Sequence, residues 1–297
     1  MARTTNHRAK RDLIGYLFIS PWLVGFLVFT AWPFVQSIYL SFTRYNIVTA
    51  PKWVGGANYQ MLLTQDELFW KSAWVTLRYA AISVPIAIVI GVVLALLLNA
   101  DVKGIAVFRT VFFLPSIVPV VATSVLFIWL LNPNIGLINR MLALIGVDGP
   151  AWLNTAPWAF YSLVMMALWG VGGSMVIYLA GLKDIPTYLY EAATIDGASA
   201  VHKLRHVTLP MLTPVIFFNL VMGIIGAFQT FTQAFVMTPG GGPQDSTYFY
   251  SLYLYNRAWK YLDMGYASAM AWMLFLVIVV LTALVFRTQR KWVHYGG

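Results

Sequence analysis

Residues 76–99 read TLRYAAISVPIAIVIGVVLALLLN, a long apolar run in which Arg78 is the single charged residue. A helix rises about 1.5 Å per residue, so about 20 apolar residues are enough to cross the hydrocarbon core of a bilayer. Pro85 interrupts the run, and prolines are tolerated in such helices where neighbouring helices satisfy the freed backbone groups. The stretch therefore predicts a membrane-spanning helix.

The rest of the chain repeats this pattern. Of its 297 residues, 60% are hydrophobic and only 10% are charged, whereas soluble proteins carry about 25% charged residues. We therefore predict an all-α membrane protein with a cytoplasmic segment 1–12, a six-helix domain 13–286 and a tail 287–297. The predicted spans are 13–35, 76–99, 109–131, 157–182, 211–236 and 264–286.

The expected topology depends on whether the first apolar run is cleaved and on which side of the membrane collects Lys and Arg. Basic residues before the first span also begin signal peptides, but bulky Trp32-Pro33-Phe34 offers no small-residue cleavage site, so we expect a retained helix. Cytoplasmic loops collect Lys and Arg, and the side richer in them predicts that both termini are cytoplasmic. That side holds Arg3, Arg8, Lys10, Arg11, Lys103, Arg109, Lys183, Lys203, Arg205, Arg287, Arg290 and Lys291.

The charged residues also limit the possible activities. All ten acidic residues fall in loops or at the edges of the predicted helices. Proton-coupled transporters place ionisable groups within the bilayer, so this distribution argues against one; it argues less against sodium coupling, because backbone carbonyls can hold Na⁺. The net charge of +9 reflects basic loops, and we expect no nucleic-acid partner.

The sequence holds no evident catalytic cluster, so we expect no enzyme, catalytic residue, metal site or cofactor in this chain. It has no cysteine and no phosphate-binding GxxxxGK[ST] motif. His202 and His206 are four residues apart and could share a helix face as metal ligands, but no third ligand is evident and a basic, lipid-facing segment is the better interpretation.

Two outer segments are also informative. Residues 136–147, GLINRMLALIGV, are apolar at helical spacing but too short to cross a membrane. They predict either a helix at the membrane interface or a loop packed on the bundle. Residues 239–243, PGGGP, predict a turn or a close contact with a docking protein.

The longest inner loop, 183–210, has the pattern of two short helices. Asp184 is a candidate N-cap close to Pro186, Gly197 a helix stop, and Ser199 the cap of a second helix to about His206. Such short helices are marginally stable alone in water. They pack either on a partner, which small Ala192 and Ala193 would let approach closely, or on the bundle's own inner face.

Residues in this loop resemble a known family. Glu191-Ala192-Ala193, Gly197 and Leu209-Pro210 have the spacing of the EAA loop of binding-protein-dependent ABC importers. Tyr16-Leu17-Phe18-Ile19-Ser20-Pro21-Trp22, Ser41-Phe42 and Gly241-Gly242-Pro243 with Thr247 are similar to the first of the two paired sugar permeases, as in maltose, lactose and glycerol-3-phosphate systems. The large outer insertion of the enterobacterial maltose subunit is missing.

The resemblance implies a type I importer permease in the cytoplasmic membrane, a multi-pass subunit that moves a sugar by alternating access. It implies a second permease subunit, ATP-binding subunits and an extracytoplasmic solute-binding protein as partners, with the lipid bilayer around them. The EAA helix docks on the ATPase in this family, which assigns that role to Glu191, Ala192, Ala193 and Gly197, with Tyr190 and Thr194 as neighbours. A permease for a non-sugar solute and a sodium-coupled transporter remain alternatives.

Helix five carries the expected substrate path. Asn219, Gly223, Gly226, Thr230 and Gln233 share a face at three/four spacing, with Gln229 beside it. Polar groups in a span avoid lipid, so this stripe either packs against other helices or contacts a sugar. Trp169 or Trp272 would then offer an apolar face to the sugar ring.

Overall fold

The computed structural model describes the backbone of residues 4–294 and the side chains from Gly15 onward. The basic residues predicted at the N-terminus, Arg3, Arg8, Lys10 and Arg11, lie outside the described side chains. The chain divides into two compact units, Met1–Gln65 with Tyr255–Met273, and Asp66–Leu254 with Leu274–Gly297. Each is described by itself.

The first unit begins with a long apolar helix. Its candidate span Gly15–Ser41 ends six residues later than predicted, because no helix breaker intervenes before Ser41. Asn58 then fastens the end of this helix to the strand that follows, since its Nδ2 donates to the carbonyl oxygens of Ser41 and Thr43 at 2.8 and 2.9 Å. The elements are α1 (Thr4–Phe26), a π-helical turn (Leu27–Ala31), α2 (Trp32–Ser41), the antiparallel strands β1 (Thr43–Arg44) and β2 (Lys52–Trp53), α3 (Ala57–Thr64) and a second π-helical turn (Asn256–Lys260).

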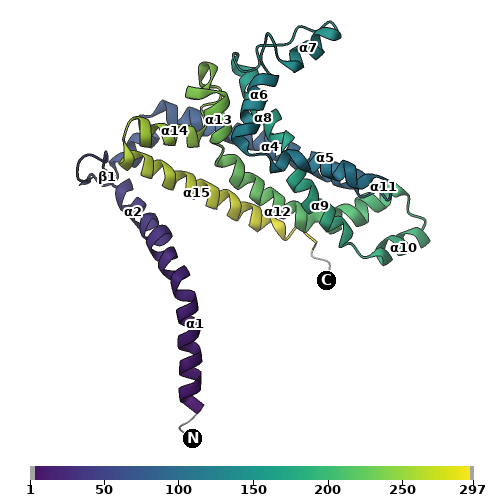
Figure 1. Ribbon diagram of the computed structural model, residues 1–297, viewed down its shortest axis with the longest axis horizontal. Coiled ribbons are helices and arrows are strands. Elements are labelled where there is room, and N and C mark those ends of the chain that lie inside the picture. Colours follow the sequence, from purple (N-terminus) through teal and green to yellow (C-terminus); the bar gives the residue numbers. More distant parts are fainter. Residues whose placement is uncertain (1–3, 295–297) are drawn as a thin grey trace. The chain divides into compact units, whose positions relative to one another are not determined.

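The second unit holds most of the helices and all of the predicted site residues except Trp272. Helix α15 (Met264–Gln289) begins in the first unit and ends in the second. The others are α4 (Glu67–Leu98), α5 (Ile105–Ile117), α6 (Val120–Leu130), α7 (Leu137–Leu144), α8 (Ala156–Trp169), α9 (Gly172–Lys183), α10 (Thr187–Ile195), α11 (Ala200–Lys203), a π-helical turn (Leu204–Thr208), α12 (Leu209–Phe228), α13 (Thr232–Met237), the 3₁₀ turns Pro239–Gly241 and Pro243–Asp245, and α14 (Tyr250–Tyr255) (Figure 1).

Among the described residues, four helices are long and apolar enough to cross a membrane, or up to six if each of two bent pairs is one span. The six predicted runs fall on these segments. Two predicted spans are bent pairs of helices, however. Helices α5 and α6 meet at 99°, because Val118 before Pro119 is extended, as residues before proline prefer to be.

The second bent pair and the fifth span also correct the prediction. Helices α8 and α9 bend by 42° at Gly170, which ends α8. In the fifth span α12 ends at Phe228 and α13 begins at Thr232. The predicted second loop helix does not stop near His206; it continues through a π-helical turn into α12, because Pro210 lies in the first turn of α12, where a missing amide is tolerated.

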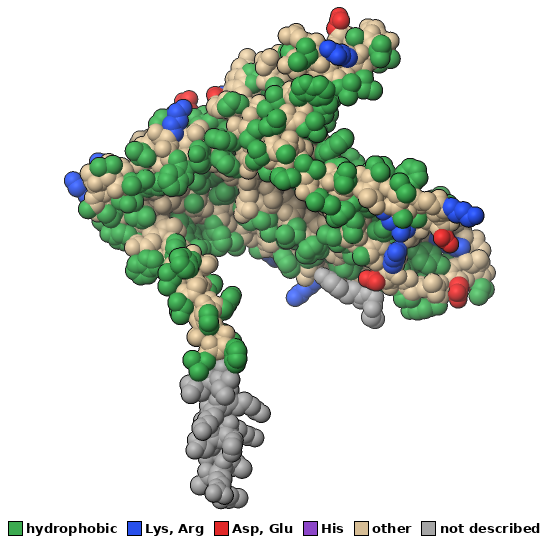
Figure 2. All heavy atoms as spheres, viewed as in Figure 1, with side chains coloured by type: hydrophobic (Ala, Val, Ile, Leu, Met, Phe, Trp, Pro, Cys, Tyr) green, Lys and Arg blue, Asp and Glu red, His purple; other side chains and the backbone are tan. Residues whose placement is uncertain are grey.

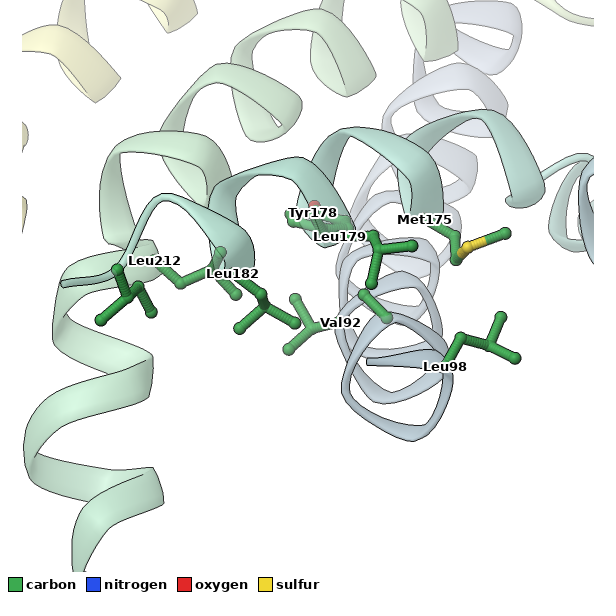
Figure 3. Packing of buried hydrophobic residues seen from close by; sticks show 9 residues of the cluster. Val92, Leu98, Met175, Tyr178, Leu179, Leu182 and Leu212 are labelled. Carbon is green, nitrogen blue, oxygen red and sulfur yellow. The ribbon is translucent and has the colours of Figure 1, made fainter. Parts of the chain in front are cut away.

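The core of the second unit forms where α4, α9 and α12 pack together. Tyr178 and Met175 of α9 are fully buried there (Figure 3). Gly91 of α4 lets the Tyr178 ring come close, since a Cβ at this glycine would lie 2.8 Å from Tyr178 Cε2. Such small residues allow close helix contacts in membranes. The cluster is Val92, Ala95, Leu98, Met175, Tyr178, Leu179, Leu182, Ile185 and Leu212.

The surface is unlike that of a soluble domain. Hydrophobic side chains cover most of the face seen in Figure 2, and charged side chains are few there. Large apolar residues such as Val107, Leu114 and Leu97 are each at least 60% exposed. Exposed apolar patches of this extent mark contact with lipid or with other chains.

Candidate functional site

A cavity of about 340 Å³ opens among α4, α8, α9, α12 and α13 in the second unit. Its apolar lining includes Val84, Ile88 and Met222, and no charged residue lines it. Hydroxyl and amide side chains supply the polarity, which suits an uncharged polar ligand. These polar lining residues are Tyr79, Ser83, Ser174, Tyr178, Asn219, Thr230 and Gln233.

The polar stripe predicted on helix five lies along this cavity. Asn219, Gly223, Gly226, Thr230 and Gln233 all line it, even though the helix is broken between Phe228 and Thr232. The stripe is therefore brought together as predicted. Whether it contacts a substrate is a separate question.

The two glycines of the stripe have different surroundings. A Cβ at Gly223 would lie 3.1 Å from Val84 Cγ1, so this glycine permits close packing of α12 on α4. A Cβ at Gly226 would meet nothing within 4 Å. Helix packing thus explains Gly223, and open cavity space surrounds Gly226.

Two tyrosines from other helices were not predicted. The Tyr79 side chain lies near Gln233 and Thr230 at the wall of the cavity. Tyr178 is fully buried, and its hydroxyl has no hydrogen-bond partner among the described residues. The spacing of Tyr79, Ser83 and Ala87 on one face of α4 was the signal that could have indicated the first.

The two predicted tryptophans lie in different surroundings. Trp169 is half exposed and lines a second cavity of about 220 Å³, which also touches Gln233. Trp272 belongs to the first unit, where its Nε1 donates to Ser37 Oγ at 3.1 Å and its ring meets the edge of Phe34. The structure thus brings Trp169 to the stripe and assigns Trp272 to packing within the first unit. Gln229 is exposed and lines neither cavity.

The loop 183–210 contains the first predicted short helix, α10, but the residue at its N-cap differs from the predicted Asp184. Asp184 ends α9, and Pro186 precedes α10 without a side-chain cap, so the predicted N-cap is wrong. Pro186 itself occupies the N-cap position and has no side-chain acceptor for the first amides of α10. Asp184 lies two residues further back along the chain, at the C-cap of α9. Ser199 does cap the following helix, since its Oγ accepts from the His202 amide.

Gly197 ends α10 as predicted. Its φ of 74° is left-handed, which glycine adopts without strain. The Ala198 amide donates to the Ala193 carbonyl at 2.8 Å and the Gly197 amide to the Thr194 carbonyl at 3.0 Å. This is the Schellman arrangement that satisfies the last carbonyl groups of a helix.

One face of α10 packs on its own bundle. Leu189 and Tyr190 contact the core cluster, and the Tyr190 hydroxyl lies 3.0 Å from Thr208 Oγ1. Thr194 Oγ1 accepts from Lys203 Nζ at 2.8 Å. Tyr190 and Thr194 thus hold α10 in place from within the chain.

The opposite face of α10 is open. Tyr188 and Ile195 are 64% and 88% exposed, and Glu191 and Ala192 between them are exposed as well. Ala193 is half-buried and lines a cavity with His202 and His206. The packed-loop interpretation therefore holds for one face of α10. The other face is exposed, and docking of a partner there stays a prediction.

His202 and His206 lie next to each other in the helical segment that Ser199 caps. The rings of His202 and His206 stack with centroids 4.0 Å apart. Among the residues that the structure describes, no group of three His, Cys, Asp or Glu side chains could hold a metal ion.

An apolar helical bundle, an uncharged polar cavity and an exposed short helix are features expected of a membrane transport subunit. The sequence profile for "Binding-protein-dependent transport system inner membrane component" matches residues 87–293. The chain belongs to this family. It is accordingly a multi-pass protein of the inner membrane, as predicted.

Individual proteins agree with this assignment. The probable ABC transporter permease protein YesP of Bacillus subtilis is 45% identical over 96% of this chain and 93% of its own. The lactose transport system permease protein LacF of Rhizobium radiobacter is 34% identical over 98% and 99%. A crystal structure of a bacterial ABC transporter that imports the acidic polysaccharide alginate matches with a TM-score of 0.83 at 24% identity, covering 96% of this chain and 98% of that one. This last match concerns the fold.

Proposed function

We propose that this chain is one half of the translocation path of an ATP-driven sugar importer. A second permease subunit completes the path, a solute-binding protein delivers the sugar from outside, and ATP-binding subunits supply the energy. ATP is hydrolysed in those partner chains, and this chain carries no cofactor. Both of its termini are cytoplasmic.

The uncharged polar cavity carries this proposal. A sugar presents many hydroxyl groups and apolar ring faces but no charge, and it is bound by hydroxyl and amide groups beside apolar surfaces. Asn219, Thr230 and Gln233 provide such groups, and Trp169 provides an apolar ring near Gln233. Relatives that carry lactose and other sugars in their names support the same substrate class.

The exposed face of α10 receives the movement of the ATP-binding subunits and transmits it to the cavity. Closure of the ATP-binding subunits presses on the face around Tyr188, Glu191 and Ile195. The opposite face passes this movement to the core through Leu189 and Tyr190, whose cluster includes Tyr178 at the cavity wall. Because packed cores are stiff, a shift of α10 moves α9 and α12 rather than being absorbed locally.

Uptake by the assembled transporter in proteoliposomes tests this proposal. With the solute-binding protein outside and ATP at the ATPase side, a panel of labelled mono- and oligosaccharides is compared with phosphate esters and polyamines. We expect at least one sugar to accumulate and to stimulate ATP hydrolysis. Stimulation by a non-sugar solute alone would refute the sugar assignment.

A further inference from the structure

Helix α7 lies away from the other helices of its unit (Figure 1), and its apolar residues are gathered on one face. Leu137, Met141, Leu144 and Ile145 follow the spacing of a single helix face. Leu144 and Ile145 are 86% and 73% exposed, and Met141 is 59% exposed. Side chains of this kind are stable only against lipid or another apolar surface.

The opposite side of α7 is fixed, so the apolar face cannot turn inward. Asn139 Nδ2 donates to the carbonyl oxygens of Pro133 and Pro150 at 3.1 and 3.2 Å, and Trp152 Nε1 donates to Asn139 Oδ1 at 2.6 Å. A Cβ at Gly149 would collide with this same amide, so the loop is closed tightly around it. The three hydrogen bonds set the rotation of the helix about its axis.

The neighbouring elements indicate what covers the exposed face. Trp129 lies near the end of α6 before α7, Trp158 near the start of α8 after it, and both rings are exposed. Tryptophan favours the boundary between hydrocarbon and water. Val121 and Val125 of α6 are also more than half exposed, as a lipid-facing span requires. The chain on both sides of α7 is therefore at the depth of a membrane surface.

Charge on α7 agrees with this position. Arg140 flanks the apolar face, is exposed, and forms no ion pair among the described residues. Arginine at an interface keeps its stem on the apolar surface while its guanidinium reaches the phosphate groups. No acidic residue lies on the helix itself.

We infer that α7 lies flat on the membrane surface, with Leu137, Met141, Leu144 and Ile145 in the acyl boundary and Arg140 at the phosphate groups of anionic phospholipids. This placement does not depend on which solute the protein carries.

Nitroxide labelling tests this placement cleanly, because the chain has no cysteine. Met141→Cys, Leu144→Cys and the control Ala143→Cys are labelled in the assembled transporter, in vesicles of phosphatidylethanolamine and phosphatidylglycerol. Ala143 is exposed but lies off the apolar face. Oxygen, which concentrates in lipid, and a water-soluble nickel chelate then report the surroundings of each label.

For each label we compare the ratio of its accessibility to oxygen with its accessibility to the nickel chelate. We expect this ratio to be at least threefold higher at positions 141 and 144 than at position 143. Equal access of the chelate to all three labels would show that α7 stands in water and would overturn the inference. Protection of 141 and 144 from both reagents, or protection appearing only when the solute-binding protein is added, would assign the face to a protein partner instead. Leu97 of α4 is also an exposed side chain on an apolar span. A label on Leu97→Cys therefore gives the reference accessibility to oxygen and to the nickel chelate for a residue in contact with lipid.

Discussion

Gln233 lines the central cavity, whereas Gln229, one helical turn earlier, is exposed outside it. The break between α12 and α13 separates these two identical side chains. Tyr79 lines the same cavity and lies near Gln233. The pair therefore offers a matched test of whether the cavity contacts the transported solute.

Gln233→Ala should slow ATP-driven uptake by about three- to tenfold. This factor corresponds to the free energy of one neutral hydrogen bond between the side chain and the solute. Gln229→Ala should leave uptake unchanged. Both are measured in proteoliposomes after assembly of the complex has been checked by size-exclusion chromatography. Equal effects of the two substitutions would remove Gln233 from the substrate path.

The glycines of the stripe separate packing from contact with the solute. Gly223→Ala should lower the midpoint of thermal unfolding in detergent relative to Gly226→Ala, because its new methyl group would lie 3.1 Å from Val84 Cγ1, which must then shift. Gly226→Ala should leave that midpoint unchanged or raise it slightly, because its methyl group enters open space and alanine favours a helix interior over glycine. It should instead weaken uptake. A stability loss at Gly226 as large as that at Gly223 would contradict the open cavity.

Gly197 is expected to matter more for energy coupling than for stability. Gly197→Ala forces a left-handed φ on alanine at a cost of about 1–2 kcal/mol. Gly146, which follows α7, has a φ of 75° and equally open surroundings, so Gly146→Ala is the matched control. Both should unfold at similar temperatures, while Gly197→Ala alone should lower uptake per ATP hydrolysed. If Gly197→Ala leaves the uptake per ATP hydrolysed unchanged, α10 does not transmit energy from the ATP-binding subunits.

The two faces of α10 predict opposite cross-linking results. The variant Tyr188→Cys should cross-link to a cysteine in the ATP-binding subunit, because Tyr188 is exposed. The variant Tyr190→Cys should not, because the side chain at position 190 faces Thr208 within this chain. The yield is measured by gel electrophoresis of the active complex. Efficient cross-linking from position 190 with none from 188 would reverse the assignment of the faces.

The sequence predicted most of the fold because the bilayer imposes strict requirements on length and composition. The six apolar runs, the stop at Gly197 and the cap at Ser199 all depend on local chemistry, and each is present in the structure. The 99° bend at Pro119 was missed because proline inside a span can be either tolerated or disruptive. Which outcome occurs depends on the neighbouring helices.

The site was predicted in part for a similar reason. The stripe from Asn219 to Gln233 lies on one segment, so its spacing was enough to find it. Tyr79 and Tyr178 come from α4 and α9, and only the packing of three helices brings them to the same cavity. Trp272 was chosen by residue type alone, which does not show which unit a side chain belongs to.

This chain should move a solute only with energy received from other chains. The most direct measurement compares two sets of proteoliposomes, one holding this chain alone and one holding it with the second permease, the ATP-binding subunits and the solute-binding protein. We predict ATP-dependent accumulation of labelled sugar in the complete set and none with the single chain. Uphill uptake or ATP hydrolysis by the single purified chain would contradict the claim.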